Sequence, residues 1–564
     1  MVANVLTEHE ETIARLVEAR AASRVHAKDA TLYSFSQEAQ DYSANFMGWA
    51  DLASNPPCSL DEIKQLAARF AEAGMESVIL IGQGGSTQAS MTMTKFNKAD
   101  SPVKFRVLDS DSPVRLRKVL AEIDPATTLV IVSSKSGGTL EMRSLFSALR
   151  TAFADDLPAD EMCKHFVAIT DPGSALEAQA KEEGWGGILS GEPTVGGRFS
   201  ALSVFGLFPA AAAGVDVDEL MARGLQAERA CSQDVPENPA IGLAAFLYDN
   251  WKAGRDKFAF VSPKRARALG LWIEQLIAES VGKGGVGVLP QVEVDPLLLS
   301  EDRGDRAVVM CNAAVYTWDE ADDFERGMNC VSTDIPFYGF TVEDTEDLAE
   351  QFVIWEYATA MLGYLMQVSP FDQPDVASVK AKVLDILDAG LPEADFVDSA
   401  TEVGAVEVRT SPACGKSADV RAALGALFAS IEPGNYFAMN AFLPFDGEGR
   451  RGALGRIRRA VAEKYGVMSC LEIGPRYMHS TGQLQKGGAD VGVYLLISAD
   501  EPKDIPLTGV PAKSLGQLSK AQATGDFLIL SERGRRCLHL HLPDNSTVTL
   551  RRFADLIEDV LREL

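Results

Sequence analysis

The sequence has 564 residues, of which 46% are hydrophobic and 24% are charged, and its formal net charge is -27. A chain of this length is too long for one hydrophobic core and predicts about two to four domains. The negative charge argues against a general nucleic-acid binder, because a phosphate backbone would be repelled. A small anion can still bind in a locally positive pocket.

The cysteines and the N-terminus indicate a cytoplasmic protein. The eight cysteines are scattered and form no CxxC pair, which suits buried thiols in a reducing compartment better than a disulfide framework or a zinc site. The first residues are acidic where a signal peptide would need an apolar core. Apolar runs stay well short of the roughly 18 residues of a membrane span. We therefore expect no metal site and no membrane partner.

The first elements in chain order lead from helix to strand. Residues 1 to about 57 are expected to be largely helical and irregular. Ser59 then caps a helix in which Glu62 takes the capping-box position and after which Gly74 follows. A strand over 77–82 comes directly afterwards and begins an α/β domain.

The next elements predict a parallel sheet with helices on both faces. Strands are expected near 105–109, 128–132 and 165–170, with helices near 113–123 and up to about 153. Ligands of such sheets lie beyond the carboxyl ends of the strands. Two glycine-bearing loops, over 82–87 and 133–139, fall on that edge.

The loop over 133–139 has the chemistry of an oxyanion site. Its serines and Thr139 offer hydroxyl donors, while Gly137 and Gly138 let backbone N–H groups turn inward without a Cβ in the way. The helix that follows adds unpaired N–H groups and the positive end of its dipole. An ordinary strand-to-helix turn with a Ser or Thr cap is the competing interpretation, and this loop alone does not separate the two.

The other loop offers a weaker alternative, a dinucleotide site. Gly82, Gly84 and an acidic Asp109 at the end of the next strand match parts of that fingerprint. The third glycine, which serves close helix-to-strand packing, is replaced by Thr87. A dinucleotide site also gives no role to the hydroxyl-rich loop, so we favour it less.

Two further alternating units follow. The second begins near residue 240, with strands expected at 257–262, 306–312 and 329–333 and helices ending near 282 and 367. After a loop-like stretch over 392–417, the third has strands expected at 436–443, 469–473, 491–497 and 536–542 and a closing helix from about 550. The predicted organisation is a helical N-terminal segment (1–57), two α/β domains (58–235 and 236–391) and a C-terminal α/β domain (392–564).

Five separated segments coincide with one family and keep its order. They are Gly84-Gly85-Ser86, Ser134-Lys135-Ser136-Gly137-Gly138-Thr139-Leu140-Glu141, Gly196-Gly197-Arg198-Phe199-Ser200, Ala278-Glu279-Ser280-Val281-Gly282-Lys283, and Phe371-Asp372-Gln373-Pro374-Asp375-Val376 with Lys380. On these residues the chain resembles glucose-6-phosphate isomerase. More narrowly, it resembles the divergent branch that forms the isomerase portion of bifunctional transaldolase/glucose-6-phosphate isomerases.

The resemblance implies an aldose–ketose isomerase that interconverts glucose 6-phosphate and fructose 6-phosphate. It implies two sugar-isomerase (SIS) type domains with parallel sheets, a homodimer and no cofactor. Glu279 would be the base that moves a proton between C2 and C1, and Arg198 would stabilise the enediolate. Lys380 and Gln373 would contact the sugar near its ring oxygen. The residues implied to bind the substrate are Gly85, Ser86, Ser134, Ser136, Gly137, Gly138, Thr139 and Gln373.

The sequence departs from the family pattern at two places. Gly137 and Gly138 stand where most relatives carry a bulky residue and a threonine, so backbone amides would replace one hydroxyl. The family also places a ring-opening histidine between the glutamate and the Phe-Asp-Gln motif, and here no histidine lies between Glu279 and Phe371. His479, in a polar turn of the third domain, is the candidate replacement. A loop histidine bonded to a carbonyl is the neutral alternative.

Two rival functions stay open. A related isomerase that also acts on mannose 6-phosphate would keep Glu279 and the hydroxyl-rich loop. A non-catalytic sugar-phosphate sensor would keep the loop but would need no base. Retention of Glu279, Arg198 and Lys380 together favours an enzyme.

Overall fold

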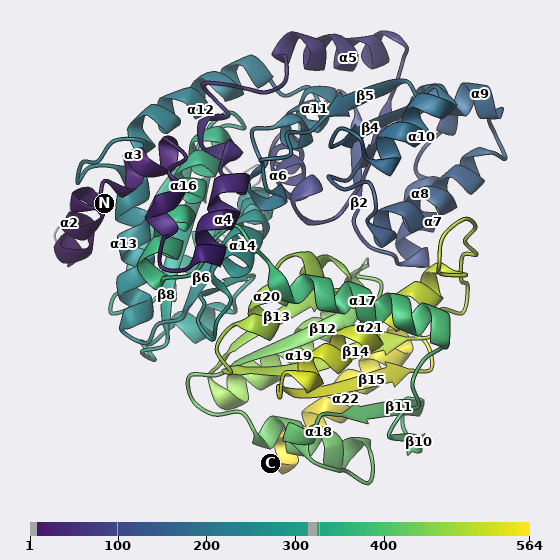
Figure 1. Ribbon diagram of the computed structural model, residues 1–564. Helices are drawn as coiled ribbons and strands as arrows, with labels where there is room; N and C mark the ends of the chain where they lie inside the picture. The colour runs from purple at the N-terminus through teal and green to yellow at the C-terminus, as the bar shows by residue number, and fades with distance from the viewer. Residues whose placement is uncertain (1–7, 99, 314–323, 326, 446) are drawn as a thin grey trace. The chain divides into compact units, whose positions relative to one another are not determined.

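The computed structural model describes residues 8–98, 100–313, 324–325, 327–445 and 447–564. Its contacts divide the chain into two compact units (Figure 1). The first unit comprises the described residues of Met1–Asp109, Ile123–Met142 and Thr151–Gln373, and the second comprises Ser110–Glu122, Arg143–Arg150 and Pro374–Leu564. The first unit contains two sheets and the second contains one, and each unit is described below by itself.

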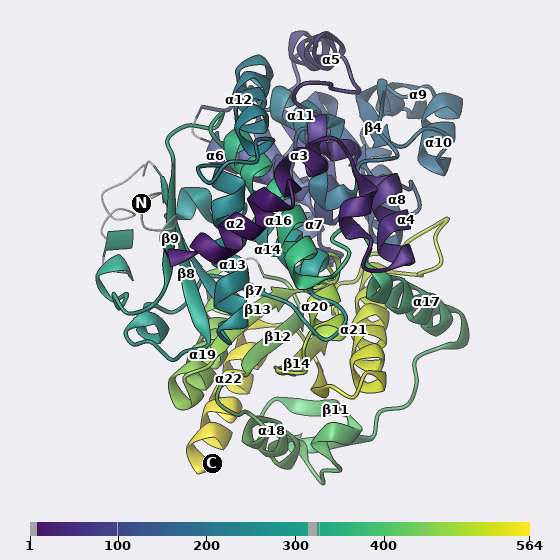
Figure 2. The same cartoon turned by 60° about the vertical axis from the view of Figure 1, so that its left-hand side comes forward.

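The N-terminal segment of the first unit is helical, as predicted. Its helices are α2 (Glu10–Glu18), α3 (Ala21–His26) and α4 (Gln37–Phe46). Figure 2 shows α2 and α3 beside α13 (Pro239–Lys252) and α16 (Leu348–Met366), which they contact. His9 Nδ1 lies 2.9 Å from Asp249 Oδ2, and His26 Nδ1 lies 2.9 Å from the Tyr357 hydroxyl. These contacts hold the N-terminal segment against α13 and α16.

The first sheet of this unit is parallel throughout and has the strand order β2-β1-β3-β4-β5. The strands are β1 (Ser77–Ile81), β2 (Lys104–Leu108), β3 (Thr128–Ser133), β4 (Phe166–Thr170) and β5 (Gly187–Ser190). Every residue of β1, β3 and β4 is buried, as expected of strands covered on both faces. The predicted parallel sheet is confirmed, and the short edge strand β5 is an addition to it.

Helices precede, join or follow these strands. The helices are α5 (Leu60–Glu72), α6 (Gln88–Phe96), α8 (Leu140–Phe153), α10 (Ala175–Glu183) and α11 (Val204–Ala212). The Ser59 hydroxyl accepts a hydrogen bond from the Glu62 amide at the start of α5, so the predicted cap is present. Since α8 begins directly after the loop over 134–139, that loop stands at a helix N-terminus.

The second sheet of the first unit is also parallel, in the order β7-β6-β8-β9. Its strands are β6 (Lys257–Val261), β7 (Leu289–Val292), β8 (Arg306–Ala313) and β9 (Phe337–Val342), and α14 (Arg267–Val281) follows β6. The strand predicted over 329–333 is wrong, because those residues end a helix and form turns. The fourth strand uses instead the aromatic and β-branched run that follows Pro336.

The second unit has a mixed sheet in the order β10-β11-β15-β14-β12-β13. Its strands are β10 (Phe396–Thr401), β11 (Gly404–Thr410), β12 (Tyr436–Phe442), β13 (Met468–Ile473), β14 (Gly492–Ala499) and β15 (Arg536–Leu542). The last four are mutually parallel and were predicted, whereas β10 and β11 form an antiparallel hairpin. The loop expected over 392–417 is therefore partly wrong. The hairpin lies at a sheet edge, and much of β10 is exposed.

The second unit also contains a set of helices. They are α7 (Pro113–Ala121), α17 (Pro374–Ala389), α18 (Val420–Ala429), α19 (Glu448–Tyr465), α20 (Gly482–Gly487), α21 (Leu515–Glu532) and α22 (Thr547–Glu563). One buried hydrophobic cluster joins α18, α19 and α22 to the sheet.

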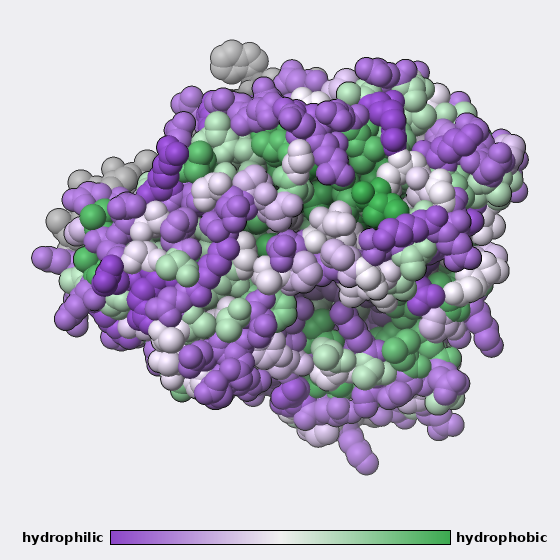
Figure 3. Space-filling view, turned by 45° about the horizontal axis from the view of Figure 1, so that its top comes forward, coloured by the Kyte–Doolittle hydropathy of each residue, from purple (hydrophilic) through white to green (hydrophobic). Residues whose placement is uncertain are grey.

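On the face seen in Figure 3, hydrophilic residues predominate over scattered hydrophobic ones. Within the described part of the chain, helices that combine the length and apolarity of a membrane span do not occur.

Candidate active site

The first sheet reverses its strand order between β1 and β3. The chain runs from β1 outward to β2 and then returns to β3 on the other side of β1. Such a switch point opens a crevice at the carboxyl ends of the two strands. The 3-10 turn η3 (Gly84–Ser86) follows β1, and the loop over 134–139 follows β3. Both predicted glycine-bearing loops therefore lie at the position where α/β sheets bind ligands.

The loop after β3 gathers its hydroxyl groups at the start of α8. Ser134 Oγ lies 3.0 Å from Thr139 Oγ1, and the Gly138 amide donates to Ser136 Oγ at 3.3 Å. Gly137 has a φ of 67°, and a Cβ there would lie 2.9 Å from the Leu176 amide nitrogen. Glycine is required at that position by both the conformation and the space. The sequence-predicted residues of this loop are thus brought together.

A close backbone approach joins η3 to the turn η6 (Gly197–Phe199). A Cβ on Gly85 would overlap the carbonyl group of Gly197, so only glycine fits. Ser200 Oγ donates to the Gly85 carbonyl at 3.3 Å, and Ser133 Oγ donates to the Ser86 carbonyl at 3.1 Å. The two loops of the switch point and the arginine-bearing turn η6 therefore form one connected edge.

Arg198 and Glu279 face each other inside this edge. Arg198 Nη1 lies 3.8 Å from Glu279 Oε2, and both residues are buried, with 4% and 5% of their surfaces exposed. Glu279 lies in the last turn of α14, which contacts both η3 and η6. A buried carboxylate at that end of the helix dipole is costly unless a cation compensates for it. The arginine supplies that cation.

Every nitrogen of the Arg198 guanidinium has an acceptor. Nε donates to Ser280 Oγ at 2.7 Å and Nη1 donates to Gln373 Oε1 at 2.8 Å. Nη2 donates to the carbonyls of Pro370 at 2.5 Å and Asp372 at 3.0 Å. Burial lowers the pKa of Arg198, and the carboxylates of Glu279 and Asp372 oppose that shift. The guanidinium is therefore held in one orientation beside the carboxylate.

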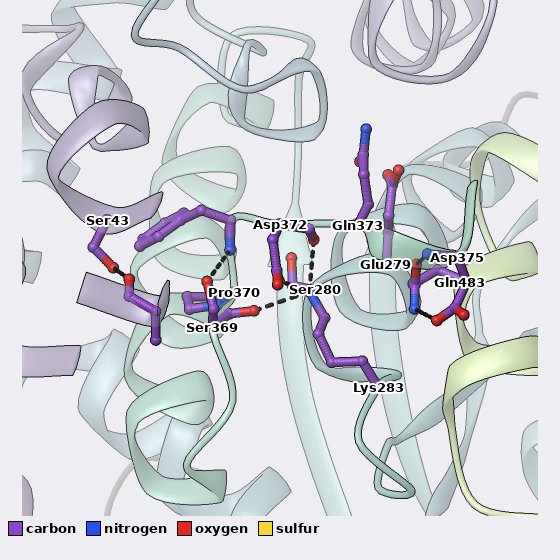
Figure 4. A network of polar contacts seen from close by, with 12 residues as sticks. Ser43, Glu279, Ser280, Lys283, Ser369, Pro370, Asp372, Gln373, Asp375 and Gln483 are labelled. Carbon is purple, nitrogen blue, oxygen red and sulfur yellow. Dashed lines mark hydrogen bonds and ion pairs between the residues drawn. The ribbon is translucent and has the colours of Figure 1, made fainter. Parts of the chain in front are cut away.

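The turn that carries Gln373 is fixed by a second buried cation, which the sequence analysis quoted in a motif but did not assign a role. Lys283 Nζ donates to Asp372 Oδ1 at 2.5 Å and to the Ser369 carbonyl at 2.9 Å (Figure 4). Burial, with the charge of Arg198, lowers the pKa of Lys283 to about 8, while Asp372 opposes the shift. This pair connects the end of α14 to the turn whose carbonyls hold Arg198.

Aromatic packing supports the same turn. Phe371 contacts Phe199 with ring centroids 5.5 Å apart and Tyr33 with centroids 5.4 Å apart. Trp49 stacks on Phe199 at 4.8 Å. Phe199 follows Arg198 in the sequence, and Phe371 lies two residues before Gln373. Because both rings are packed in the core, they hold these two polar neighbours in position. The N-terminal segment contributes two of these four rings.

Gln275 is another site residue that the sequence analysis missed. Its Nε2 donates to Glu279 Oε2 at 3.1 Å, one helical turn earlier on α14. Its Oε1 is buried without a hydrogen-bond partner among the described residues. The available signal was the i, i+4 spacing of an amide and a carboxylate on one helix.

The remaining predicted residues belong to the second unit. Lys380 is exposed on α17, and His479 is half-buried at the end of the 3-10 turn η10 (Arg476–His479). The first unit therefore brings together Arg198, Glu279, Gln373 and the two ligand loops. Groups of three metal-ligating side chains that could hold an ion are not found among the residues that the structure describes.

The fold belongs to the SIS-type α/β class, in which parallel sheets are flanked by helices. A hypothetical protein from Thermus thermophilus superposes with a TM-score of 0.56 and 25% identity, covering 67% of this chain and 97% of that one. A glucose-6-phosphate isomerase from Chlamydia trachomatis has a TM-score of 0.50 and 18% identity, covering 69% of this chain and 85% of that one.

Sequence comparisons find similarity to one family over part of the chain. A family model described as phosphoglucose isomerase matches residues 65–290, a range that includes both ligand loops, Arg198 and Glu279. The glucose-6-phosphate isomerase of Mycoplasmopsis pulmonis is 28% identical over 389 residues, which cover 61% of this chain and 90% of that protein. A probable glucose-6-phosphate isomerase of Haloarcula marismortui is 34% identical over 244 residues, covering 43% of this chain and 55% of that protein. The chain is therefore similar to glucose-6-phosphate isomerases over part of its length, including the residues of the candidate site.

Proposed function

We propose that the protein interconverts glucose 6-phosphate and fructose 6-phosphate through a cis-enediol intermediate. The observation that carries this proposal is the buried Glu279–Arg198 pair at the edge of a sheet whose switch-point loops offer hydroxyls and amides. The isomerisation moves a proton between adjacent carbons without net oxidation, so it needs one base and positive charge near the oxygens. Glu279 and Arg198 supply these two groups without a cofactor.

Glu279 takes the proton from C2 of the open-chain aldose and returns it to C1. A single carboxylate suffices because both carbons present the same face of the enediol. Arg198, 3.8 Å away, compensates the negative charge of this carboxylate inside the buried edge. Since the four donor contacts of the guanidinium fix its orientation, its charge is in place before the enediolate forms.

The loop over 134–139 anchors the phosphate at the start of α8. Ser134, Ser136 and Thr139 donate hydroxyl bonds, and the amides of Gly137 and Gly138 replace the donor that a further threonine would give. The turn η3 completes the site from the neighbouring strand with Gly85 and Ser86. Binding energy at the phosphate then positions the reacting carbons at the other end of the sugar.

The residues proposed for ring opening come from the motif that runs from Phe371 to Lys380. Lys380 and Gln373 are assigned to the sugar near its ring oxygen, with Lys380 helping to open and close the ring. His479 is assigned as the acid–base partner of that step in place of the missing family histidine. The roles of Lys380 and Gln373 are carried over from the order of the family's motifs, whereas His479 lies outside that motif and is the candidate replacement for the missing histidine.

The finer assignments follow the same motifs. The five segments in family order support the divergent branch related to the isomerase portion of bifunctional transaldolase/glucose-6-phosphate isomerases. A homodimer is proposed from the common habit of the family. A cytoplasmic location is proposed because all eight cysteines are free, as a reducing compartment would keep them.

The first prediction tests the base directly. In a coupled assay of fructose 6-phosphate conversion, Glu279→Gln is expected to lower kcat by about 10²–10⁴-fold, because the amide cannot accept the C2 proton. Glu182→Gln, which changes an exposed acid on α10, is the matched control and should keep parental turnover.

Two outcomes would contradict the proposal. A parent that binds fructose 6-phosphate without converting it would be a sensor and not an enzyme. Equal turnover by the parent and Glu279→Gln would show that another group is the base. The same assay with mannose 6-phosphate distinguishes the related isomerase of broader specificity, since a strict glucose 6-phosphate isomerase leaves that sugar unchanged.

A further inference from the structure

The N-terminus of α17, the helix that carries Lys380, is held by a reciprocal pair of buried hydrogen bonds. The Asp375 amide donates to Gln483 Oε1 at 3.0 Å, and Gln483 Nε2 donates back to Asp375 Oδ2 at 2.6 Å (Figure 4). Asp375 is 4% exposed and Gln483 is fully buried. One side chain of α20 therefore satisfies both the main chain and the carboxylate at the first turn of α17.

A third residue completes this N-terminal lock, as we call the set of Asp375, Gln483 and Arg533. Arg533 Nη2 binds Asp375 Oδ1, the carboxylate oxygen that Gln483 leaves free. Arg533 caps the C-terminus of α21. The two oxygens of Asp375 are thus bound from two different elements, and hydrogen bonds to a charged group are both strong and directional.

The helix that presents the glutamine of the lock is itself rigidly held. In α20, Lys486 Nζ lies 2.6 Å from Asp526 Oδ1, and Tyr477 donates to the other oxygen of Asp526 at 2.7 Å. Asn440 of β12 donates to Gln485 Oε1 at 2.8 Å. All five of these side chains are buried. Because α20 is tied to β12 and α21, the lock can transmit a fixed position to α17.

Apolar packing alone does not determine where α17 stands along its own axis. The helix packs against α21 through a buried apolar stripe, and a Cβ on Gly525 would lie 3.1 Å from Val383 Cγ2. Such contacts hold the two helices close together but are non-directional. The polar bonds at Asp375 are directional and fix one residue of the helix to α20 and α21, so they can define its axial position. Lys380 lies five residues further along α17, so its position along the helix axis depends on the position of Asp375.

We propose that Gln483 and Arg533 are positioning residues that set the axial position of α17 and thereby place the Lys380 ammonium group for ring opening. This inference rests on the proposed function and on the role that it gives to Lys380. It assigns to the C-terminal unit a task in the reaction, performed by residues that do not touch the sugar. A lock that serves stability alone is the competing explanation.

A double-mutant cycle separates the two explanations. Gln483→Glu places a second carboxylate against Asp375, and in the parent it is expected to lower kcat/KM by about 10- to 100-fold, as a displacement of about 1 Å does. In a Lys380→Ala background the same change is expected to have no further effect, since the displaced group is already absent. Additive losses in the two backgrounds would overturn the inference.

A reversed pair provides the rescue. In the double variant Asp375→Asn with Gln483→Glu, the asparagine amide can donate to the new carboxylate while its oxygen still accepts from Arg533. Its kcat/KM is expected to return to within about threefold of the parent. A double variant that folds but stays as slow as Gln483→Glu would contradict the inference.

Folding is monitored by circular dichroism for every variant. If Gln483→Glu does not fold, Arg533→Gln runs the same cycle, because Arg533 is half-exposed and its loss removes only one bond of the lock. Failure of the proposed function has a different signature. If the Lys380→Ala single variant has parental kcat/KM, Lys380 takes no part in the mechanism. If Lys380→Ala is impaired but the losses from Lys380→Ala and Gln483→Glu are additive, only the positioning role is removed.

Discussion

At the scale of single residues, the site uses burial to give ordinary side chains special properties. Without the family motif Glu279 resembles a surface acid near a helix end, and its burial beside Arg198 supports the role of base that the motif implies. Lys283 likewise becomes part of the site by holding Asp372 next to Arg198. These four groups, Arg198, Glu279, Lys283 and Asp372, therefore form a cluster of cations and carboxylates. Each charge in it compensates the desolvation of another.

The hydroxyl loop should affect binding more than turnover. In the proposed site, Ser134→Ala removes one hydrogen bond to the phosphate. A bond to a charged group contributes about 1.5 kcal/mol, so KM for fructose 6-phosphate should rise about tenfold. Since the phosphate is bound equally in the ground and transition states, kcat should stay within about twofold of the parent. Steady-state kinetics measure both constants, with the exposed Ser54→Ala as control. A fall in kcat at unchanged KM would place Ser134 near the reacting carbons instead.

At the scale of elements, strong patterns predicted the fold and weak ones did not. The buried β-branched strands β1, β3 and β4 and the capped helix α5 were identified from sequence because propensity, burial and capping agree there. Strands β5 and β7 were missed. Both are short edge strands, and each contains a glycine or a proline that weakens the pattern.

The candidate site was predictable as far as its motifs extended. The residue types at the carboxyl ends of β1 and β3 indicated an anion site, and the family motif named Glu279 and Arg198. Contacts between distant segments left no local signal. The overlap that requires glycine at position 85 and the bonds from Gln483 to Asp375 both depend on tertiary packing. The roles of His479 and Lys380 remain predictions.

The parallel strand β13 carries a buried acid near its end whose protonation should affect stability. Burial raises the pKa of Glu472 to about 7, although Arg476 and a hydrogen bond with Thr481 oppose the shift. Its folded pKa lies above the unfolded value, so Glu472 favours folding below about pH 4.5, and this contribution is lost as the pH rises through 7. Glu472→Gln should therefore be less pH-dependent between pH 5 and 8 in urea unfolding of the second unit. A parental slope in this variant, or a change in the exposed control Glu463→Gln, would contradict this assignment.

At the scale of the whole molecule, the net charge of the chain opposes the charge of the proposed substrate. The net charge is -27, while a sugar phosphate carries nearly two negative charges at neutral pH. In the proposed site, Arg198, the α8 N-terminus and the loop amides attract the negatively charged substrate only at close range. The distant acids act over a Debye length, which is about 30 Å at 0.01 M salt and about 8 Å at 0.15 M.

This opposition predicts an unusual salt dependence. Raising the salt from about 0.01 M to 0.15 M should increase kcat/KM for fructose 6-phosphate about two- to tenfold, because screening weakens the long-range repulsion more than the short contacts in the site. The effect should reside in KM, since the proposed chemical step takes place in the buried cluster around Glu279. Initial rates in potassium chloride and in choline chloride separate screening from specific ion binding. A steady fall of kcat/KM over the same range would mean that the local positive charge of the site, and not the net charge of the molecule, governs the encounter.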